Sequence, residues 1–322
     1  VLNKTGDGTL VIGQVADGMT INVQGGKVGF GGVSITDTAV AVNPYVHLDA
    51  ESIGADDVED VGDLSYVNTW KDENYGAERQ ATAALSGTSR PTLKTSALVG
   101  NRKIVDFGER SQTAGVGAWM KLCNWESPGH QAYAGFMVLR CKEPGSNPHF
   151  GSSNGMTFYR DATDCIIAPY YKNLCLGAAL WRVNGATEDP FSSSSLNQTD
   201  RFVVLSFASV TPAQLDALVA DKGGQSSVAD AGGLEVGEVV VYDRPLTEPE
   251  FYSTEAYLMK KWLGVERPNE ANVAEMTVGN DAAAELSSDQ NLTIGRLTGG
   301  DGTIVKDGSG FVSVGSLSAL PT

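Results

Sequence analysis

Few residues of this sequence have the types and spacing that covalent catalysis requires. Gly151-Ser152-Ser153-Asn154-Gly155 fits the G-x-S-x-G pattern, in which a strand leads into a nucleophilic serine and a helix follows it. Here a strand-like run at 156–159 follows the pattern instead of a helix, and His149 lies too near in sequence to imply a triad. We therefore interpret 151–155 as a Gly/Ser loop and expect no serine nucleophile.

Metal ligation is the next chemistry to consider. The sequence contains no D-x-[DN]-x-[DN]-G loop, no H-E-x-x-H pair and no C-x-x-C pair, which disfavours an EF-hand, a zincin and a zinc ribbon. Calcium stays open, because Asp and Asn side chains in loops supply the oxygen ligands that it prefers. The candidate ligands are Asp161 and Asp164, with a second set in the loop 184–189. Exposed turn acids are the alternative interpretation of both sets.

A sugar site needs an aromatic surface beside polar side chains, and one region offers both. The candidate ligand-binding residues are Trp181, Arg182, Asn184, Asp189 and Tyr170. The alternative is that Trp181 ends a strand and fills the core, as large aromatic side chains commonly do.

The four cysteines favour two disulfides in an oxidising compartment. Four cysteines allow three pairings, and we favour the two that each close a short loop, Cys123–Cys141 and Cys165–Cys175. Four buried thiols are the alternative.

Composition limits the classes of partner. The net charge of −16 disfavours nucleic acid and anionic lipid, both of which bind clustered Lys and Arg. No apolar run is long enough to cross a membrane as a helix, and 41% hydrophobic residues are enough for a buried core. The chain begins at Val1 without a signal-peptide pattern, which we interpret as a processed or excised piece of a longer precursor.

Short strands separated by Gly and Asp are expected at both ends of the sequence. They fall at 9–13, 19–23, 27–30 and 33–36, and again at 274–278, 284–286, 292–294, 302–305 and 311–314. Lys4–Gly13 and Lys306–Gly315 share Lys and three glycines in register, which indicates a turn feeding a strand, the unit of a β-solenoid.

The middle of the sequence predicts longer strands and two helices. Strands are expected at 119–123, 134–141, 156–160, 165–168, 176–183, 202–208 and 236–242. Thr247 and Glu250 form a T-x-x-E capping box for a helix over 248–263, which Gly264 ends. A second short helix is expected after Thr211-Pro212, running to about Asp221. Many strands and few helices favour a two-sheet sandwich of jelly-roll type.

Two resemblances follow from these residues. The terminal strings "NKTGDGTLVIG" and "QNLTIGRLTGGDGTIVKDGSG" resemble the autotransporter-associated β-strand repeats of bacterial surface proteins. The middle contains "VHLDAESI", "VNTWKDENYG", "SRPTLKTSALVGNRKIVDFG" and "GEVVVYDRPLTEPEFYSTEAYLMKKWLG", and it resembles the laminin-G-like, concanavalin A-like jelly rolls of bacterial secreted proteins.

The second resemblance implies two curved antiparallel sheets but no single function, since such domains bind glycans or proteins or act as spacers. Glucanases of this fold carry E-x-D-x-x-E on one strand, and the sequence lacks that pattern. We interpret the acidic stretch 56–63 as a solvated loop, and we expect Trp70-Lys71-Asp72 and Asp243-Arg244 to serve the fold.

The sequence therefore predicts a mainly β protein with a jelly-roll domain at 45–265 inserted between β-solenoid segments at 1–44 and 266–322. We expect a non-catalytic, extracellular protein of a bacterial cell surface, a subunit or repeat of a filament or adhesin stalk. Its partners would be copies of itself or adjacent repeats of a longer parent chain. The first alternative is a lectin-like module that binds a glycan, with or without Ca²⁺, and a remote one is a polysaccharide-active enzyme.

Overall fold

The computed structural model describes residues 1–7, 9–12, 19–25, 27–30, 38–111, 113, 116–122, 131–143, 148–151, 158–159, 166, 180–196, 199–213, 215, 217–220, 231–265, 270–278, 283–287, 291–299, 303–307 and 312–318. The chain divides into two compact units, one made of both ends of the chain, Val1–Ser34 and Pro268–Thr322, and one made of Ile35–Arg267. We call these the terminal unit and the central unit.

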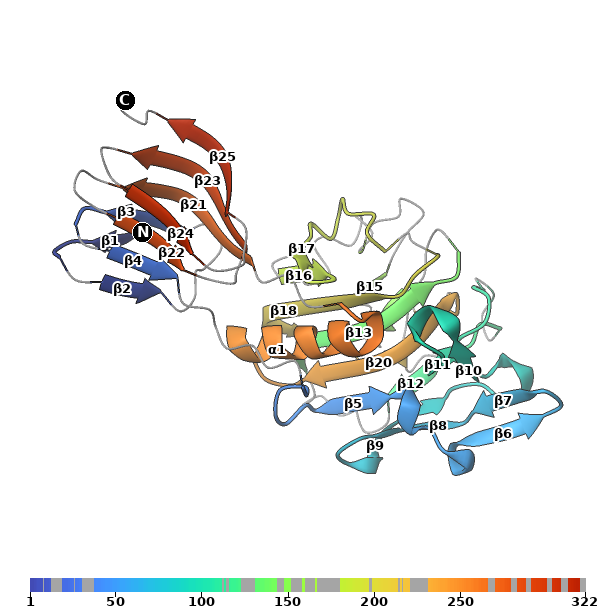
Figure 1. Ribbon diagram of the computed structural model, residues 1–322. Coiled ribbons are helices and arrows are strands. Elements are labelled where there is room, and N and C mark those ends of the chain that lie inside the picture. The colour runs from blue at the N-terminus through green and yellow to red at the C-terminus, as the bar shows by residue number, and fades with distance from the viewer. Residues whose placement is uncertain are drawn as a thin grey trace. The chain divides into compact units, whose positions relative to one another are not determined.

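Strands of the terminal unit alternate between two parallel sheets. Its strands are β1 (Leu2–Lys4), β2 (Thr9–Ile12), β3 (Met19–Val23), β4 (Lys27–Phe30), β21 (Glu270–Val278), β22 (Ala283–Ser287), β23 (Asn291–Gly299), β24 (Thr303–Asp307) and β25 (Val312–Ser318). In the described residues one sheet has the order β1-β3-β21-β23-β25 and the other β2-β4-β22-β24. Every described pair of these strands is parallel. Consecutive strands along the chain lie in alternate sheets. In Figure 1 the blue strands of the amino-terminal end lie beside the red strands of the carboxyl-terminal end, and each sheet contains both.

The register stacks residues of one kind on each other. Across the five-stranded sheet an apolar position runs through Leu2, Ile21, Met276, Leu297 and Leu317. The next position along each strand is polar, through Asn3, Asn22, Thr277, Thr298 and Ser318. Ile21 and Met276 are fully buried, as expected for side chains that alternate between the two faces of a sheet.

Lys4 lies at the end of β1 and is buried, with 8% of its surface exposed. Its ammonium donates hydrogen bonds to the carbonyl oxygens of Thr5, Gly6 and Gly25 at 2.9, 2.6 and 3.0 Å. The Lys4 ammonium thus links the backbone carbonyl groups that follow β1 with one that follows β3. The sequence match between Lys4 and Lys306 does not reflect equivalent places, because β1 and β24 belong to different sheets.

The central unit contains two antiparallel sheets. In the described residues the larger sheet has ten strands, β5 (Val46–Asp49), β6 (Val58–Val61), β7 (Leu64–Val67), β10 (Thr92–Ser96), β11 (Arg102–Asp106), β13 (Ala132–Cys141), β16 (Leu180–Val183), β17 (Ala186–Thr187), β18 (Val203–Ala213) and β20 (Leu234–Tyr242). The described part of the smaller sheet has six, β8 (Thr69–Asp72), β9 (Gly76–Ala83), β12 (Met120–Leu122), β14 (Pro148–Gly151), β15 (Phe158–Tyr159) and β19 (Ala217–Leu218). Four short 3-10 turns of the described residues lie between strands of these sheets, η1 (Ala50–Ser52), η2 (Ala55–Asp57), η3 (Gly87–Ser89) and η4 (Ala97–Val99).

The two antiparallel sheets share one hydrophobic core, as in a β-sandwich. Phe150 of the smaller sheet meets Phe207 of the larger one edge to face, with ring centroids 6.1 Å apart. The whole of β20 is buried, which requires cover on both faces of the sheet. On one of those faces the ring of Phe136 packs 4.8 Å from Phe251 of the helix.

The predicted helix is confirmed as α1 (Glu248–Leu258) and a π-helical turn, Met259–Leu263. The Glu250 carboxylate accepts hydrogen bonds from the N–H and hydroxyl of Thr247, at 2.8 and 2.9 Å. Gly264 ends the helix in the left-handed conformation, at φ 67°. This conformation favours glycine, because a Cβ atom would be strained there.

Two expectations about local structure are wrong. Thr211 and Pro212 continue strand β18, and Ala217–Leu218 form β19, so the described residues do not form the second helix. β18 pairs with β13 on both sides of this stretch, through 203–208 and through Ala213, and the residues between them stay in the strand. The acidic stretch 56–63 is also no simple loop, since Asp57 is buried in η2 and Val58–Val61 form β6. There Asp57 accepts hydrogen bonds from the Gly54 N–H and the Thr69 hydroxyl.

The other strand expectations agree with the structure where it describes them. The expected strands at 119–123, 134–141, 202–208 and 236–242 correspond to β12, β13, β18 and β20, and all nine strands of the terminal unit except β1 were expected from the sequence. The expected strand at 33–36 lies outside the described residues, as does 165–168 apart from Ile166.

Candidate functional site

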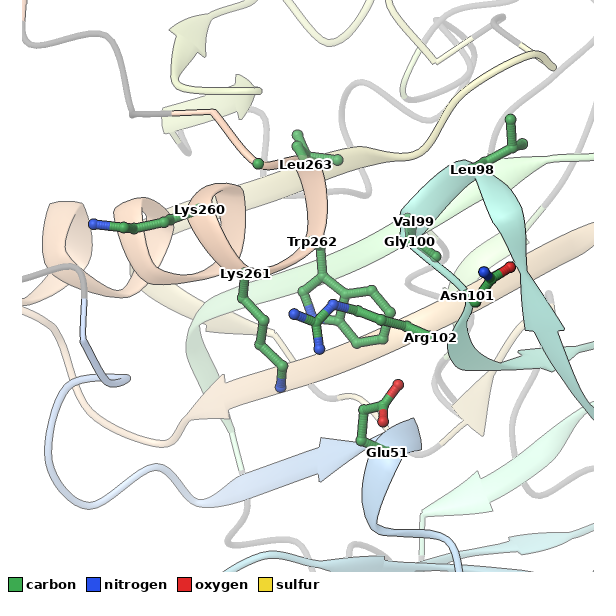
Figure 2. Close-up of a pocket in the computed structure, with 11 residues that line it drawn as sticks. Glu51, Leu98, Val99, Gly100, Asn101, Arg102, Lys260, Lys261, Trp262 and Leu263 are labelled. Carbon is green, nitrogen blue, oxygen red and sulfur yellow. The ribbon is translucent and has the colours of Figure 1, made fainter.

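An open depression of about 590 Å³ lies between the end of the helix and the turn that leads into β11 (Figure 2). Its walls are Glu51 of η1, the turn 98–102 and the helix end 260–264. Gly100 and Asn101 take left-handed conformations in succession, with φ of 69° and 62°. Glycine and asparagine tolerate that region, so this turn reverses the chain and places Arg102 at the first position of β11.

The guanidinium of Arg102 lies beside the Trp262 ring in this depression (Figure 2). Its central carbon lies 5.7 Å from the centroid of the Trp262 ring, a cation–π distance. In the described part of the chain no carboxylate is within ion-pair distance of Arg102. Figure 2 shows Glu51 below the guanidinium and the Lys260 side chain pointing away from it.

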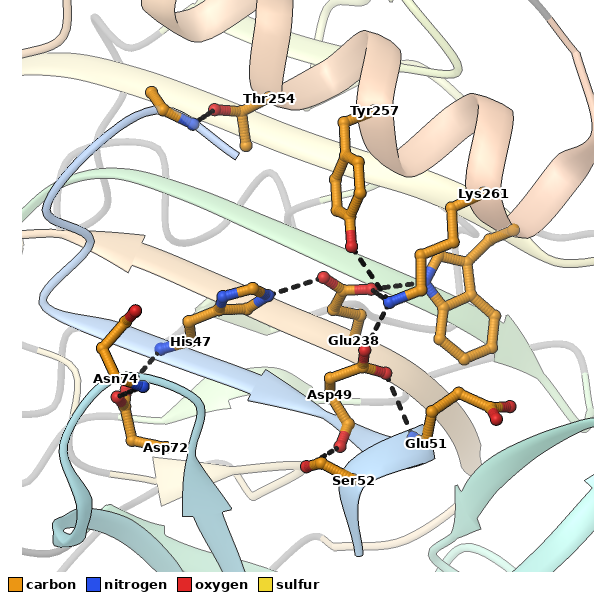
Figure 3. A network of polar contacts seen from close by, with 12 residues as sticks. His47, Asp49, Glu51, Ser52, Asp72, Asn74, Glu238, Thr254, Tyr257 and Lys261 are labelled. Carbon is orange, nitrogen blue, oxygen red and sulfur yellow. Dashed lines mark hydrogen bonds and ion pairs between the residues drawn. The ribbon is translucent and has the colours of Figure 1, made fainter. Parts of the chain in front are cut away.

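Behind the depression lies a buried polar network centred on Glu238 (Figure 3). One Glu238 oxygen is 2.7 Å from Nε2 of His47. The other accepts hydrogen bonds from Lys261 Nζ and from the Trp262 indole N–H, both at 2.6 Å. Lys261 also contacts the Asp49 carboxylate and the Tyr257 hydroxyl.

A β-bulge places this carboxylate. Val138 of β13 is opposite Glu238, and the next residue, Leu139, is opposite Val236, so Gly237 is the extra residue. The Trp262 ring lies against Gly237, where an added Cβ would be 2.7 Å from the ring. The bulge therefore turns Glu238 toward the helix, and the missing side chain at 237 makes room for the indole.

Burial and charge oppose each other in this network. Burial raises the pKa of Glu238, but the hydrogen bond from His47 and the charge of Lys261 outweigh it, so the net pKa is below its usual value. Burial lowers the pKa of Lys261, and the charge of Glu238 with the hydrogen bonds to Asp49 and Glu238 raises it overall. For Asp49, burial and the nearby Glu238 charge raise the pKa against the hydrogen bond from Lys261.

The network joins β5, β20 and the helix end, so its first role is to hold the helix on the sheet. Glu238 is fully buried and its described partners use both of its oxygens. A general base needs a lone pair that faces substrate. The Arg102 depression is open, in contrast, and its guanidinium is available to a ligand.

The predicted ligand-binding residues divide into buried and exposed positions. Trp181 is 1% exposed, and Arg182 is 4% exposed with its guanidinium 3.2 Å from Glu255. Asn184 accepts a hydrogen bond from the Val204 N–H, while Asp189 is exposed and accepts from the Ser192 hydroxyl. The structure brings Trp181, Arg182 and Asn184 together as parts of the fold. Binding by this region stays a prediction.

Several predicted residues lie outside the described part of the chain. They are Tyr170, the calcium candidates Asp161 and Asp164, and the cysteines Cys123, Cys165 and Cys175. Cys141 is buried in β13. The disulfide pairing and the calcium site therefore stay predictions. Among the described residues no group of three His, Cys, Asp or Glu side chains is arranged to hold a metal ion.

Sequence reasoning missed Arg102 and Glu238. The only local signal for Arg102 is the preceding Gly100-Asn101 pair, which predicts a tight turn. Glu238 stands in the largely apolar strand β20, and a carboxylate in such a strand indicates a buried, paired group.

Comparison with known proteins adds no relative. No protein-family model, no curated protein and no solved structure matches this chain. In the described residues no helix is long and apolar enough to cross a membrane.

Proposed function

We propose that this chain is a non-catalytic building block of an extracellular bacterial surface structure. In this proposal the terminal unit is a short β-solenoid that continues into further coils, and the central unit is a laminin-G-like jelly roll that the solenoid carries. The supporting observation is the strict alternation of strands between two parallel sheets in register.

The coil length supports a solenoid. Register partners are 19 residues apart from Leu2 to Ile21, 21 from Ala271 to Leu292, and 20 from Leu292 to Val312. Stacked coils of near-constant length bury a continuous core, and each coil contacts its neighbours only. Such an array keeps open strand edges at its ends unless something covers them.

Both ends of the five-stranded sheet carry edge strands in the described residues, β1 and β25. The Lys4 carbonyl accepts a hydrogen bond from the Gln24 N–H, so Lys4 points its backbone groups toward β3. Backbone groups alternate in direction along a strand, and Asn3 therefore presents its N–H and C=O to the open edge. That edge is able to accept another parallel strand.

The two edges are complementary to each other. Leu2 and Leu317 occupy the apolar position of the register, and Asn3 and Ser318 occupy the polar position. A second copy added head to tail would continue both positions, and a head-to-tail contact that does not close gives a filament. We take a copy of this chain as the partner to be tested.

Light scattering over a concentration series, with electron microscopy of the same samples, tests this proposal. We expect a mass that rises with concentration and linear particles. Asn3→Pro removes the edge N–H while leaving the backbone groups that face β3, and it should lower the association. Asn3→Ala keeps the N–H and is the matched control. A monomer at all concentrations, or equal association of both variants, would contradict the proposal.

A further inference from the structure

The depression around Arg102 contains a cation that forms no ion pair with a described carboxylate, although Glu51 lies on the opposite wall. Three other partly buried cations of the central unit are paired, Lys261 with two carboxylates, Arg182 with Glu255 and Arg140 with Glu235. Arg79 and Lys103 instead donate hydrogen bonds to backbone carbonyls. Arg102 is half-buried and has no ion pair within the described residues, in a chain of net charge −16. A half-buried guanidinium binds an anion more strongly than an exposed one, because solvent screens it less.

Trp262 restricts the guanidinium. The ring lies 5.7 Å from it, and the ring is itself fixed by the hydrogen bond to Glu238 and by contact with Gly237. A guanidinium that is already held loses less freedom when it forms two parallel hydrogen bonds to a carboxylate. The Arg102 guanidinium therefore suits a single carboxylate group better than a surface with spread-out negative charge.

Hydrogen-bond acceptors surround this cation. Glu51 lies on the opposite wall, and one of its oxygens accepts from the Lys103 N–H. Trp262 and Leu263 of the last helical turn also line the depression, and the last carbonyl groups of a helix have no further turn to supply N–H donors. A ligand must therefore place a carboxylate on Arg102 and donor groups on the surrounding acceptors.

We propose that the Arg102 depression binds an acidic saccharide, with the carboxylate of a uronic acid residue on the guanidinium. The sugar hydroxyls then donate to Glu51 and to the carbonyls of the helix end. This binding function goes beyond the assembly of the terminal unit and does not rest on it.

The same geometry argues against neutral sugars and apolar ligands. Trp262 is 2% exposed, so its ring offers no face for a sugar to stack on. Without stacking, a neutral sugar has only hydrogen bonds that compete with water, which contribute little net free energy. The acid group supplies the selectivity.

Calorimetric titration of the full chain with uronic acid tetramers tests this inference. The probes are oligogalacturonate, oligoguluronate and oligomannuronate, and a neutral galactose tetramer and succinate are the comparison ligands. We expect at least one acidic tetramer to bind, no binding of the neutral tetramer, and weaker binding of succinate, which has the charge but not the hydroxyls.

Variants at two arginines separate a specific site from general charge. Arg102→Gln should weaken binding of the acidic tetramer at least tenfold. Arg102→Lys should recover only part of that affinity, since lysine cannot form the paired hydrogen bonds. Arg201→Gln removes an equal charge at an exposed position next to Asp200 and should change nothing. A thermal melt confirms that each variant folds.

Three results would overturn the inference. They are no binding of any acidic tetramer, equal binding to Arg102→Gln and the parent chain, or equal binding of neutral and acidic tetramers. Because the titration is done with the central unit intact at low protein concentration, its failure would leave the assembly of the terminal unit untouched.

Discussion

Ile21 of β3 and Met276 of β21 are register partners in one parallel sheet, although the central unit lies between them in the sequence. Both side chains are fully buried. The strands before and after the central unit therefore belong to one continuous stack. Along the chain, the central unit is the connection between β4 of one parallel sheet and β21 of the other.

This relationship predicts that the terminal unit folds without the central one. We expect a chain in which the segment 31–269 is replaced by a copy of the connection 308–311 to show a β-rich circular dichroism spectrum and a cooperative melt. Adding Met276→Asp should abolish the melt, because a charge would enter the apolar position. Thr277→Asp, at the adjacent and less buried position, is the control. An excised chain that is unfolded would show that the stack needs the central unit.

The buried network around Glu238 predicts a large loss of unfolding free energy when the Glu238 charge is removed. Glu238→Gln leaves Lys261 partly uncompensated in a buried site, and such losses are about 3 kcal/mol of unfolding free energy. Urea unfolding followed by tryptophan fluorescence measures this, since all five tryptophans belong to the central unit. The control Glu59→Gln removes an exposed carboxylate that pairs with Arg90 and should cost about 0–1 kcal/mol. Similar losses for both variants would contradict the structural role of the network.

Gly237 predicts a steric effect on the same network. Gly237→Ala places a Cβ 2.7 Å from the Trp262 ring, and we expect a loss of about 1–3 kcal/mol as the indole moves. Gly54→Ala is the control, because the nearest atom to its Cβ is 3.6 Å away. Unfolding free energies from urea titration of the two variants would decide the point. A neutral Gly237→Ala would mean that the ring is not seated on the bulge.

Glu250 predicts a pH effect at the start of the helix. The hydrogen bond from Arg244 and those from Thr247 lower the pKa of Glu250 from 4.5 to about 2, against the effect of burial. A lowered pKa in the folded state means that this contribution to stability is present above pH 4.5 and is lost as the pH falls toward 2. Carboxyl chemical shifts followed by NMR should give a pKa near 2, and Arg244→Gln should raise it. An unchanged pKa in that variant would exclude the ion pair as the cause.

Local signals in the sequence predicted some elements well. Thr247, Glu250 and Gly264 define both ends of the helix, because capping depends on residues close together in the chain. The Gly-separated strands of both chain ends were also predictable from composition and spacing. That both chain ends form one unit was not predictable, because β3 pairs with β21 although the whole central unit separates them in the sequence.

The candidate site shows the same division. The turn at Gly100-Asn101 follows from residue type, but nothing local indicates that Arg102 faces Trp262. Pro212 shows the opposite error, since proline after threonine resembles a helix start while the segment stays extended within β18. Trp181, a plausible sugar platform by residue type, lies in the core because β16 pairs with β18.

The central claim is head-to-tail assembly through β1 and β25. Disulfide trapping across this proposed junction tests it most directly. Asn3 and Ser318 occupy equivalent positions in the register, so the test uses the variants Asn3→Cys and Ser318→Cys. Neighbouring strands lie about 4.8 Å apart, which allows a disulfide between these two positions of adjacent copies. After mixing and oxidation, we predict a linked peptide joining position 3 of one copy to position 318 of another, identified by mass spectrometry. Only 3–3 and 318–318 links, or no link between copies, would contradict the account.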